Sequence, residues 1–147
     1  MVNKNWIWIP FNVPSLKNSK IKTSRGIFPS KTVKKYLQKL GIQRYSVSKK
    51  EVKGYVTKEN LFENLRWEFQ KQIKNKTYPL KIGFHFIRDS KRKFDFHNAV
   101  QIIADLMVAH DFIEDDDMTC FLPVPLKYKG KYYSIDKEKP GVLIKIY

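Results

Sequence analysis

Half of the acidic side chains in this 147-residue chain lie in one short stretch, residues 95–117. The seven acids of that stretch are Asp95, Asp105, Asp111, Glu114, Asp115, Asp116 and Asp117. Clustered carboxylates repel one another unless they share a cation, and carboxylate oxygens are ligands that Mg²⁺ prefers. The spacing therefore predicts a site for a divalent metal ion.

Asp95 and Asp116 are the two carboxylates that we expect to hold this ion, with His97 beside them. Mg²⁺ usually takes one or two protein carboxylates and completes its octahedron with water and substrate oxygens. Asp95 and His97 lie two positions apart, so in extended backbone both side chains point the same way. His97 suits Mn²⁺ better than Mg²⁺, and it can also hold or deprotonate an attacking water. The alternative is that residues 114–117 form a solvated acidic turn.

The chain as a whole is strongly basic, with 29 Lys and Arg against 14 Asp and Glu and a formal charge of +15. Such a surface attracts nucleic acid or an anionic membrane. The apolar run at residues 6–9 is too short to span a bilayer or to form the core of a signal peptide, so we expect no membrane partner. Hydrolysis of a phosphodiester needs charge neutralisation and an activated water, which metal ions supply. The combination favours a metal-dependent enzyme acting on nucleic acid; the alternative is a merely solvated basic surface.

Cysteine and histidine are too few to build a structural zinc site. Cys120 is the single cysteine, so no internal disulfide is possible, and we expect it to be buried at the start of a strand. A single cysteine without an internal disulfide predicts a protein of the reducing cytoplasm. We expect His85 and His110 to be incidental, and Met107 to belong to the core. The length and the 42% hydrophobic content predict one domain over residues 1–147.

The elements that must position these residues follow from hydrophobic periodicity. We expect strands at residues 6–9, 79–88, 121–128 and 142–147, and helices at 31–40, from 60 to about 74, and at 98–110. Residues 15–30 are polar and rich in turn formers, which predicts a loop, and residues 42–57 predict an insertion or flexible connection. Ser30 is expected to cap the first helix, and Asn60 with Glu63 resembles a capping box. The order predicts an α/β (α+β) fold, a small mixed sheet with two or three helices.

The pattern around the acidic stretch resembles the RusA family of Holliday-junction resolvases. That family shows a basic run, Asp-x-Asp-Asn, a helix, an aromatic or aliphatic pair, and Asp-Asp. The matching segments here are Lys91 to Asn98, the predicted helix, and Asp111 to Asp116. Pro14-Ser15 with Asn18 and Lys20, and Phe28-Pro29-Ser30 leading into Tyr36, are similar to two upstream segments of the family. The likeness covers nearly the whole chain, apart from residues 42–57.

The resemblance implies a small α/β homodimer, often encoded by phages and prophages, that binds four-way DNA junctions and nicks them symmetrically with Mg²⁺. On this likeness Asp95 and Asp116 match two catalytic aspartates, and Asn98 matches the motif asparagine. Two positions depart from the family: His97 stands where it has a second aspartate, and Gln101 where it has a lysine. Losing one carboxylate and one cation leaves the local charge unchanged, which favours a compensated site.

Several polar and basic side chains are predicted to contact DNA. Those near the acidic stretch are Lys91, Arg92, Lys93, Asn98 and Gln101. Those in the first predicted loop are Lys17, Lys20, Lys22 and Arg25. Phosphate contacts of this kind position the substrate without reading its bases. Phe94 and Phe96 are expected to be core residues beneath the site rather than stacking platforms for unpaired bases.

Three functions stay open at this level. The first is a Mg²⁺- or Mn²⁺-dependent endonuclease that resolves branched DNA, four-way Holliday junctions, in recombination and repair. The second is a DNA-structure-binding protein that kept the fold with weakened or lost catalysis, which His97 and Gln101 favour. The third is a basic RNA-binding protein, which explains the lysines but not the acidic cluster.

Overall fold

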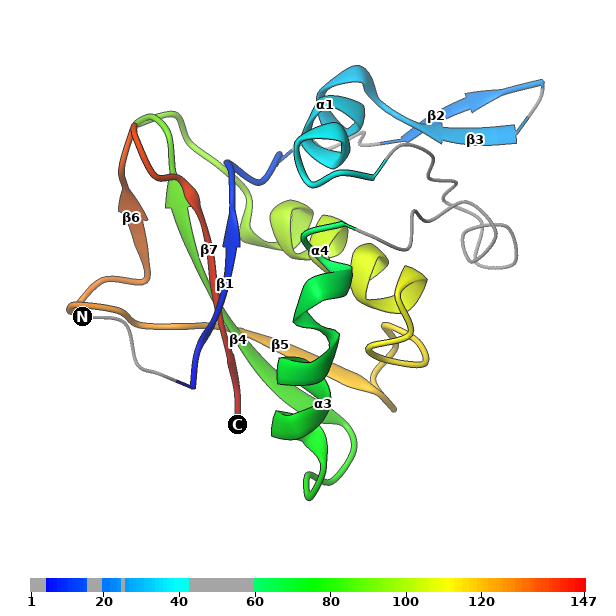
Figure 1. The fold of residues 1–147 in the computed structure, drawn as a ribbon. Helices are drawn as coiled ribbons and strands as arrows, with labels where there is room; N and C mark the ends of the chain where they lie inside the picture. Colours follow the sequence, from blue (N-terminus) through cyan, green and yellow to red (C-terminus); the bar gives the residue numbers. More distant parts are fainter. Residues whose placement is uncertain (1–4, 16–19, 25, 43–59) are drawn as a thin grey trace.

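The computed structural model describes residues 5–15, 20–24, 26–42 and 60–147 (Figure 1). The chain has a mixed α+β fold built on a five-stranded sheet. The strands are β1 (Ile7–Pro10), β2 (Lys20–Thr23), β3 (Gly26–Pro29), β4 (Leu80–Arg88), β5 (Phe121–Pro125), β6 (Tyr133–Ile135) and β7 (Gly141–Ile146). The helices are α1 (Lys31–Lys39), the short 3-10 helix η1 (Glu63–Leu65), α3 (Arg66–Ile73) and α4 (Phe96–Ala109).

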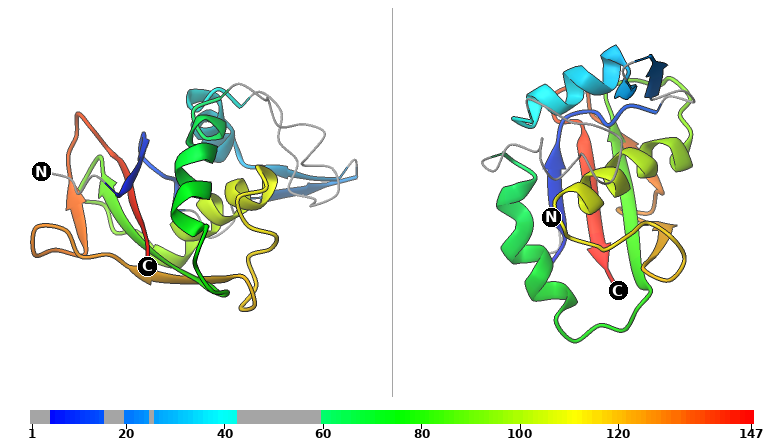
Figure 2. Two further views of the ribbon diagram at one scale, coloured as in Figure 1. Left: turned by 60° about the horizontal axis from the view of Figure 1, so that its bottom comes forward. Right: turned by 90° about the vertical axis from the view of Figure 1, so that its right-hand side faces the viewer.

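Strand β4 is the centre of the sheet. Strand β7 runs antiparallel to it on one side, and β1 runs antiparallel to β7. On the other side two short strands run parallel to β4: β5 pairs with its first half, from Leu80, and β6 with its second half, from Phe86. Helices α3 and α4 lie on the same face of this sheet (Figure 2). The prolines in β5 lie in an edge strand, where their missing N–H groups cost no ladder hydrogen bond.

The hydrophobic core fills the space between the sheet and α4. Alternate residues of β4, including Ile82, Phe84 and Phe86, are buried against apolar residues of α4 such as Ile103 and Leu106. On the second face of the strand, Gly83 and His85 are buried, whereas Lys81 is exposed and Ile87 is half-buried. The buried residues fix the direction of β4 and hence the point where its end leads into α4.

Most of the predicted elements are confirmed. The strands at β1, β4 and β7 and the helix α1 lie within two residues of their expected bounds. Ser30 caps α1 by accepting a hydrogen bond from the Val33 backbone nitrogen at 3.4 Å. The Asn60 side chain accepts from the Glu63 nitrogen at 2.8 Å, as in a capping box, but the helix expected from residue 60 starts as the 3-10 helix Glu63–Leu65, and the α-helix begins only at Arg66. Cys120 and Met107 are buried, as expected.

Three expectations were wrong. The loop predicted at residues 15–30 contains the antiparallel hairpin β2–β3, which forms a separate two-stranded sheet. Its lysines conceal the strand pattern, because the hairpin pairs outside the main sheet. Strand β6 was not expected, since three residues are too few to show a period. Helix α4 begins at Phe96 rather than Asn98, because Asp95 caps it, so His97 lies in the helix and not in the extended backbone that we expected.

Some of the predictions fall on residues outside the described part of the chain. These are most of the connection expected at residues 42–57, and two of the predicted DNA contacts, Lys17 and Arg25. No helix in the described part is long and apolar enough to cross a membrane.

Candidate functional site on helix α4

Helix α4 carries a single polar stripe. Among its 14 residues the polar ones are His97, Asn98, Gln101 and Asp105, and at about 3.6 residues per turn they fall within roughly a third of the circumference. The remaining faces are apolar and mostly buried. No Lys or Arg occurs between Phe94 and Leu126, so this stripe is acidic in a chain whose net charge is +15.

Asp95 forms the N-cap of α4. Its Oδ1 accepts hydrogen bonds from the backbone nitrogens of His97 at 2.9 Å and Asn98 at 3.4 Å. A carboxylate is stabilised here because the first N–H groups of a helix and its dipole both favour negative charge. Within the described residues its second oxygen, Oδ2, accepts no hydrogen bond, and the residue is exposed. One oxygen thus orders the helix while the other faces outward.

Ser15 fixes the backbone at Asp95. The Ser15 hydroxyl accepts a hydrogen bond from the Asp95 nitrogen at 2.7 Å and donates one to the Asp95 carbonyl oxygen at 3.0 Å. Two further bonds join the same N-terminal segment to the end of β4. Arg88 donates to the Val13 carbonyl, and the Asn12 side chain accepts from the Asp89 nitrogen at 3.1 Å. Sequence reasoning assigned Ser15 no role beyond its likeness to a family segment.

The acidic loop turns back sharply at the end of α4. Asp111 adopts a left-handed backbone conformation with φ of 59°. The next residue, Phe112, donates its backbone hydrogen bond to the Met107 carbonyl at 2.8 Å, and Phe112 and Ile113 are both buried. These contacts direct the following acids back along the helix rather than away from it.

The returning loop places Asp116 against the polar stripe. The Gln101 side-chain amide donates one hydrogen bond to Asp105 Oδ1 at 2.8 Å and a second to Asp116 Oδ2 at 2.9 Å. Because both oxygens bind one NH₂ group, they lie within about 6 Å of each other. Two anionic oxygens therefore approach a single donor group, and a cation that replaced the amide would need them to move closer together.

Gln101 lies six residues beyond Asp95, which corresponds to about 9 Å of helical rise. The structure brings Asp116 close to Asp105 through the Gln101 amide, whereas sequence reasoning paired Asp116 with Asp95. The described ranges contain no group of three or more His, Cys, Asp or Glu side chains placed to hold a metal ion. The pairing of Asp95 with Asp116 stays a prediction.

The donor atoms at this pair still fit a hard divalent ion. Asp105 and Asp116 supply carboxylate oxygens, and the Gln101 amide carries a carbonyl oxygen that can face the same point after rotation. Mg²⁺ prefers such oxygen ligands and needs one or two carboxylates from the protein. His97 is exposed one helical turn before Gln101, and its ring packs edge-on against Phe96 with 5.7 Å between the ring centroids.

Three of the predicted DNA contacts lie just before the N-terminal end of α4. Lys91, Arg92 and Lys93 are all exposed and directly precede Phe94 and Asp95. Lys20 lies in β2, and Asn98 is half-buried on the stripe. The rings of Phe94 and Phe96 pack edge-on against Phe86, with 6.0 and 5.8 Å between ring centroids, and both are partly buried against the core, as expected.

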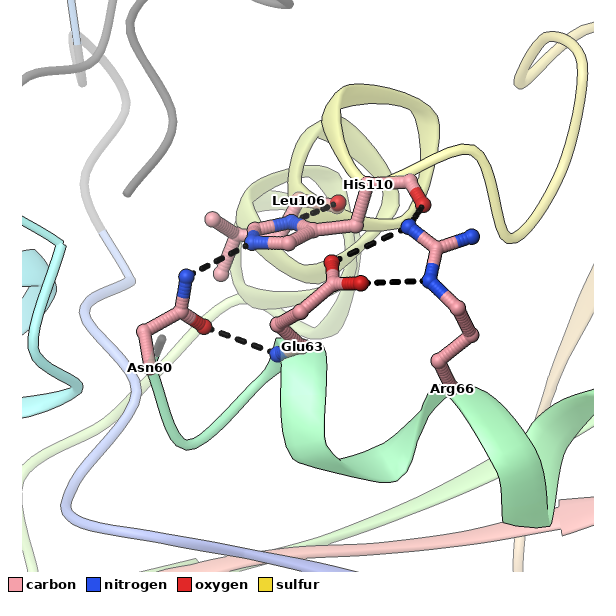
Figure 3. Close-up of polar contacts among 5 residues, drawn as sticks. All are labelled: Asn60, Glu63, Arg66, Leu106 and His110. Atoms are coloured by element: carbon pink, nitrogen blue, oxygen red, sulfur yellow. Dashed lines mark hydrogen bonds and ion pairs between the residues drawn. The ribbon is translucent and has the colours of Figure 1, made fainter. Parts of the chain in front are cut away.

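A second polar network fixes the other end of α4 (Figure 3). His110 is buried; its Nδ1–H donates to the Leu106 carbonyl at 2.7 Å, and its Nε2 accepts from the Asn60 side chain at 3.2 Å. Arg66 forms an ion pair with Glu63 and donates to the His110 carbonyl. Burial lowers the pKa of His110, so the ring stays neutral near pH 7. This histidine was expected to be incidental, but it anchors the start of the acidic loop to α3.

The chain was compared with protein-family models, with curated proteins and with solved structures, and none of the three comparisons gave a match.

Proposed function

We propose that this protein is a metal-dependent endonuclease that cuts branched DNA, with four-way junctions as its substrate. One observation supports this most strongly: the acidic loop returns Asp116 to the helix that Asp95 caps, where it shares the Gln101 amide with Asp105. An acidic stripe repels a polyanion, so attraction of nucleic acid to a chain of net charge +15 does not explain it. It suits a metal ion placed beside DNA.

In this proposal Asp105 and Asp116 hold the ion, which is Mg²⁺ or Mn²⁺. When bound, a divalent ion neutralises charge on the phosphate and the leaving oxygen and lowers the pKa of a coordinated water. Asp95 presents its Oδ2 from the end of the same helix, and His97 is the base that holds or deprotonates the attacking water. Gln101 orients Asp116 while the site is empty of metal.

The exposed basic residues Lys91, Arg92 and Lys93 hold phosphates next to the scissile bond. Each phosphate neutralised adds about 0.9 to the slope of log affinity against log salt for duplex DNA. A junction that is nicked symmetrically needs two sites, so we propose a homodimer in which each subunit cuts one strand.

The test is cleavage of a synthetic four-way junction in Mg²⁺ and in Mn²⁺. We expect Asp105→Asn and Asp116→Asn to reduce the rate by more than about 100-fold, since they remove direct ligands and outer-shell changes alone often cost 10- to 100-fold. Glu114→Gln is the matched control, because it removes the same charge from an exposed position of the same loop. Cutting by both aspartate variants at the wild-type rate would remove the proposed ligands.

A second candidate is a DNA-structure-binding protein without catalysis. It is favoured by the Gln101 amide, which satisfies Asp105 and Asp116 without any metal, and by His97 in place of a family carboxylate. Tight junction binding with no cutting in any divalent metal, and cutting gained by His97→Asp, would support this candidate over the first.

A further inference from the structure

The connection between β5 and β6 is a basic and aromatic segment that the proposed nuclease site does not use. It reads Lys-Tyr-Lys-Gly-Lys-Tyr-Tyr over residues 127–133, with three lysines, three tyrosines and no acid. We refer to it as the Lys-Tyr hairpin. In Figure 1 it is the orange segment on the side of the sheet away from the β2–β3 hairpin.

The backbone of the Lys-Tyr hairpin is fixed by a tight turn. Tyr128 and Lys131 exchange two backbone hydrogen bonds, of 2.8 and 3.1 Å. The two residues between them, Lys129 and Gly130, both have positive φ, of 50° and 79°. Such a two-residue turn matches the twist of a hairpin and holds its strands in one register. The side chains that it carries are therefore presented in a defined arrangement.

The base of the hairpin is anchored by buried contacts. His85 lies fully buried in β4; its Nδ1–H donates to the Leu126 carbonyl at 2.9 Å, and its Nε2 accepts from the Ser134 hydroxyl at 2.6 Å. The ring of Tyr128 packs edge-on against His85 at 5.4 Å and against Trp6 at 5.8 Å. One tyrosine is thus used for anchoring, which leaves the other two for the surface.

Those two tyrosines are unusually exposed. Tyr132 is 61% and Tyr133 50% exposed, and all three lysines of the hairpin are exposed as well. The Lys127 ammonium lies 5.7 Å from the centre of the Tyr132 ring. Exposed rings interleaved with cations are the composition of surfaces that bind single strands, where bases stack on the rings and lysines hold the phosphates. Without an acid in the hairpin, a polyanion is the complementary partner.

The hairpin is also continuous with the proposed nuclease site. The Tyr133 ring packs edge-on against Phe94 at 5.4 Å, and Phe94 directly precedes Asp95. A strand that leaves the N-terminal end of α4 can therefore follow the exposed surface from Phe94 over Tyr133 to the turn. We propose that the Lys-Tyr hairpin binds unpaired DNA, with a base stacked on Tyr132 and phosphates held by Lys127, Lys129 and Lys131. This binding requires neither metal nor catalysis.

The test measures binding of the full chain to a fluorescently labelled 20-nucleotide oligothymidine by anisotropy, in EDTA. We expect Tyr132→Ala to weaken binding at least about fivefold, and Tyr132→Phe to bind like the wild type, because the ring and not the hydroxyl stacks. Trp67→Ala is the matched control, since Trp67 is 82% exposed on α3. Wild-type affinity of Tyr132→Ala, or an equal loss in Trp67→Ala, would overturn the proposal.

The lysines are tested by the salt dependence of the same binding. Changing Lys127, Lys129 and Lys131 together to Gln should lower the slope of log affinity against log salt by about 2, at about 0.7 per phosphate of a single strand. The charge-matched control changes the exposed Lys71, Lys74 and Lys76 to Gln and should leave the slope near its wild-type value. Equal slopes for the two triple variants would show a general charge effect and overturn the site. Tighter binding of oligouridine of the same length would overturn the assignment to DNA.

The Asp116→Asn variant separates this proposal from the nuclease. It should bind oligothymidine in EDTA as the wild type does, because Asp116 lies on the α4 stripe and bonds to Gln101 rather than to the hairpin. Loss of oligothymidine binding in that variant would show that the α4 site, not the Lys-Tyr hairpin, holds the strand. Failure of junction cleavage, by contrast, leaves the binding result unchanged.

Discussion

Replacing Gln101 with glutamate tests the convergence of Asp105 and Asp116 without any assumption about activity. The two side chains have the same size and shape, but a carboxylate cannot donate a hydrogen bond to another. The variant therefore loses the bonds of 2.8 and 2.9 Å and places a third negative charge beside two others. We expect Gln101→Glu to be less stable than the wild type in EDTA, and to recover when a divalent ion is added.

The size of the effect follows from the exposure and spacing of these groups. Each exposed hydrogen bond contributes about 0.5 kcal/mol, at the low end of measured values. Each new repulsion at about 4 Å adds roughly 1 kcal/mol in a water-like medium. The total is about 3 kcal/mol, which for a chain of this length corresponds to a fall in Tm of roughly 6–12 °C. An ion present at 100 times its Kd would restore about 2.7 kcal/mol.

The assay is urea unfolding followed by tryptophan fluorescence, in EDTA and in millimolar Mg²⁺ or Mn²⁺. Gln101→Lys is the control, because an ammonium group can replace the amide between Asp105 and Asp116, and it should keep wild-type stability in EDTA. If Gln101→Glu were as stable as the wild type in EDTA and insensitive to metal, Asp105 and Asp116 would not converge on this position.

Three further variants test the contacts that hold α4. Ser15→Ala removes both hydrogen bonds to the Asp95 backbone and should lower the free energy of unfolding by about 1–2 kcal/mol, whereas Ser15→Thr should restore most of it. Burial lowers the pKa of His110 and of His85, so the unfolded chain takes up protons first and stability falls as the pH drops below about 6.5. The free energy of unfolding changes by at most about 1.4 kcal/mol per pH unit for each histidine, and His110→Gln should remove the contribution of one histidine. Arg66→Ala breaks the bond to the His110 carbonyl and should cost about 1–2 kcal/mol, of which Arg66→Lys recovers only part.

Each of these expectations has a clear contrary result in urea unfolding. Equal stability of Ser15→Ala and the wild type would mean that the hydroxyl does not hold the Asp95 backbone. A wild-type pH slope in His110→Gln would remove this ring as the group that titrates. Full recovery by Arg66→Lys would show that a simple positive charge, rather than the forked guanidinium, holds the end of α4.

The sequence predicted those elements whose apolar residues are regular and buried. Strand β4 and helix α4 each show a clear period, because one packs on the other over most of its length. Their junction placed Asp95 correctly at the boundary of the helix, although its role as the cap was missed. The β2–β3 hairpin was missed because its strands pair with each other outside the main sheet, so no buried face marks them.

The site was harder to predict than the elements, because its contacts join distant positions. Ser15 and Asp95 are 80 residues apart, and nothing in either segment points to the other. The approach of Asp116 to Asp105 depends on the left-handed turn at Asp111. A left-handed turn is predicted most readily from a glycine, and Asp111 is not one. Acidic composition indicated a shared cation, but only the path of the loop decides which two carboxylates face each other.

The most direct test of the central claim is the position of a Mn²⁺ ion bound to the crystalline protein, located by its anomalous scattering. We expect a peak in direct contact with carboxylate oxygens of Asp105 and Asp116, and loss of that peak in Asp116→Asn. A Mn²⁺ ion bound away from these two side chains, or no peak at a concentration that supports junction cleavage, would contradict the proposed metal site.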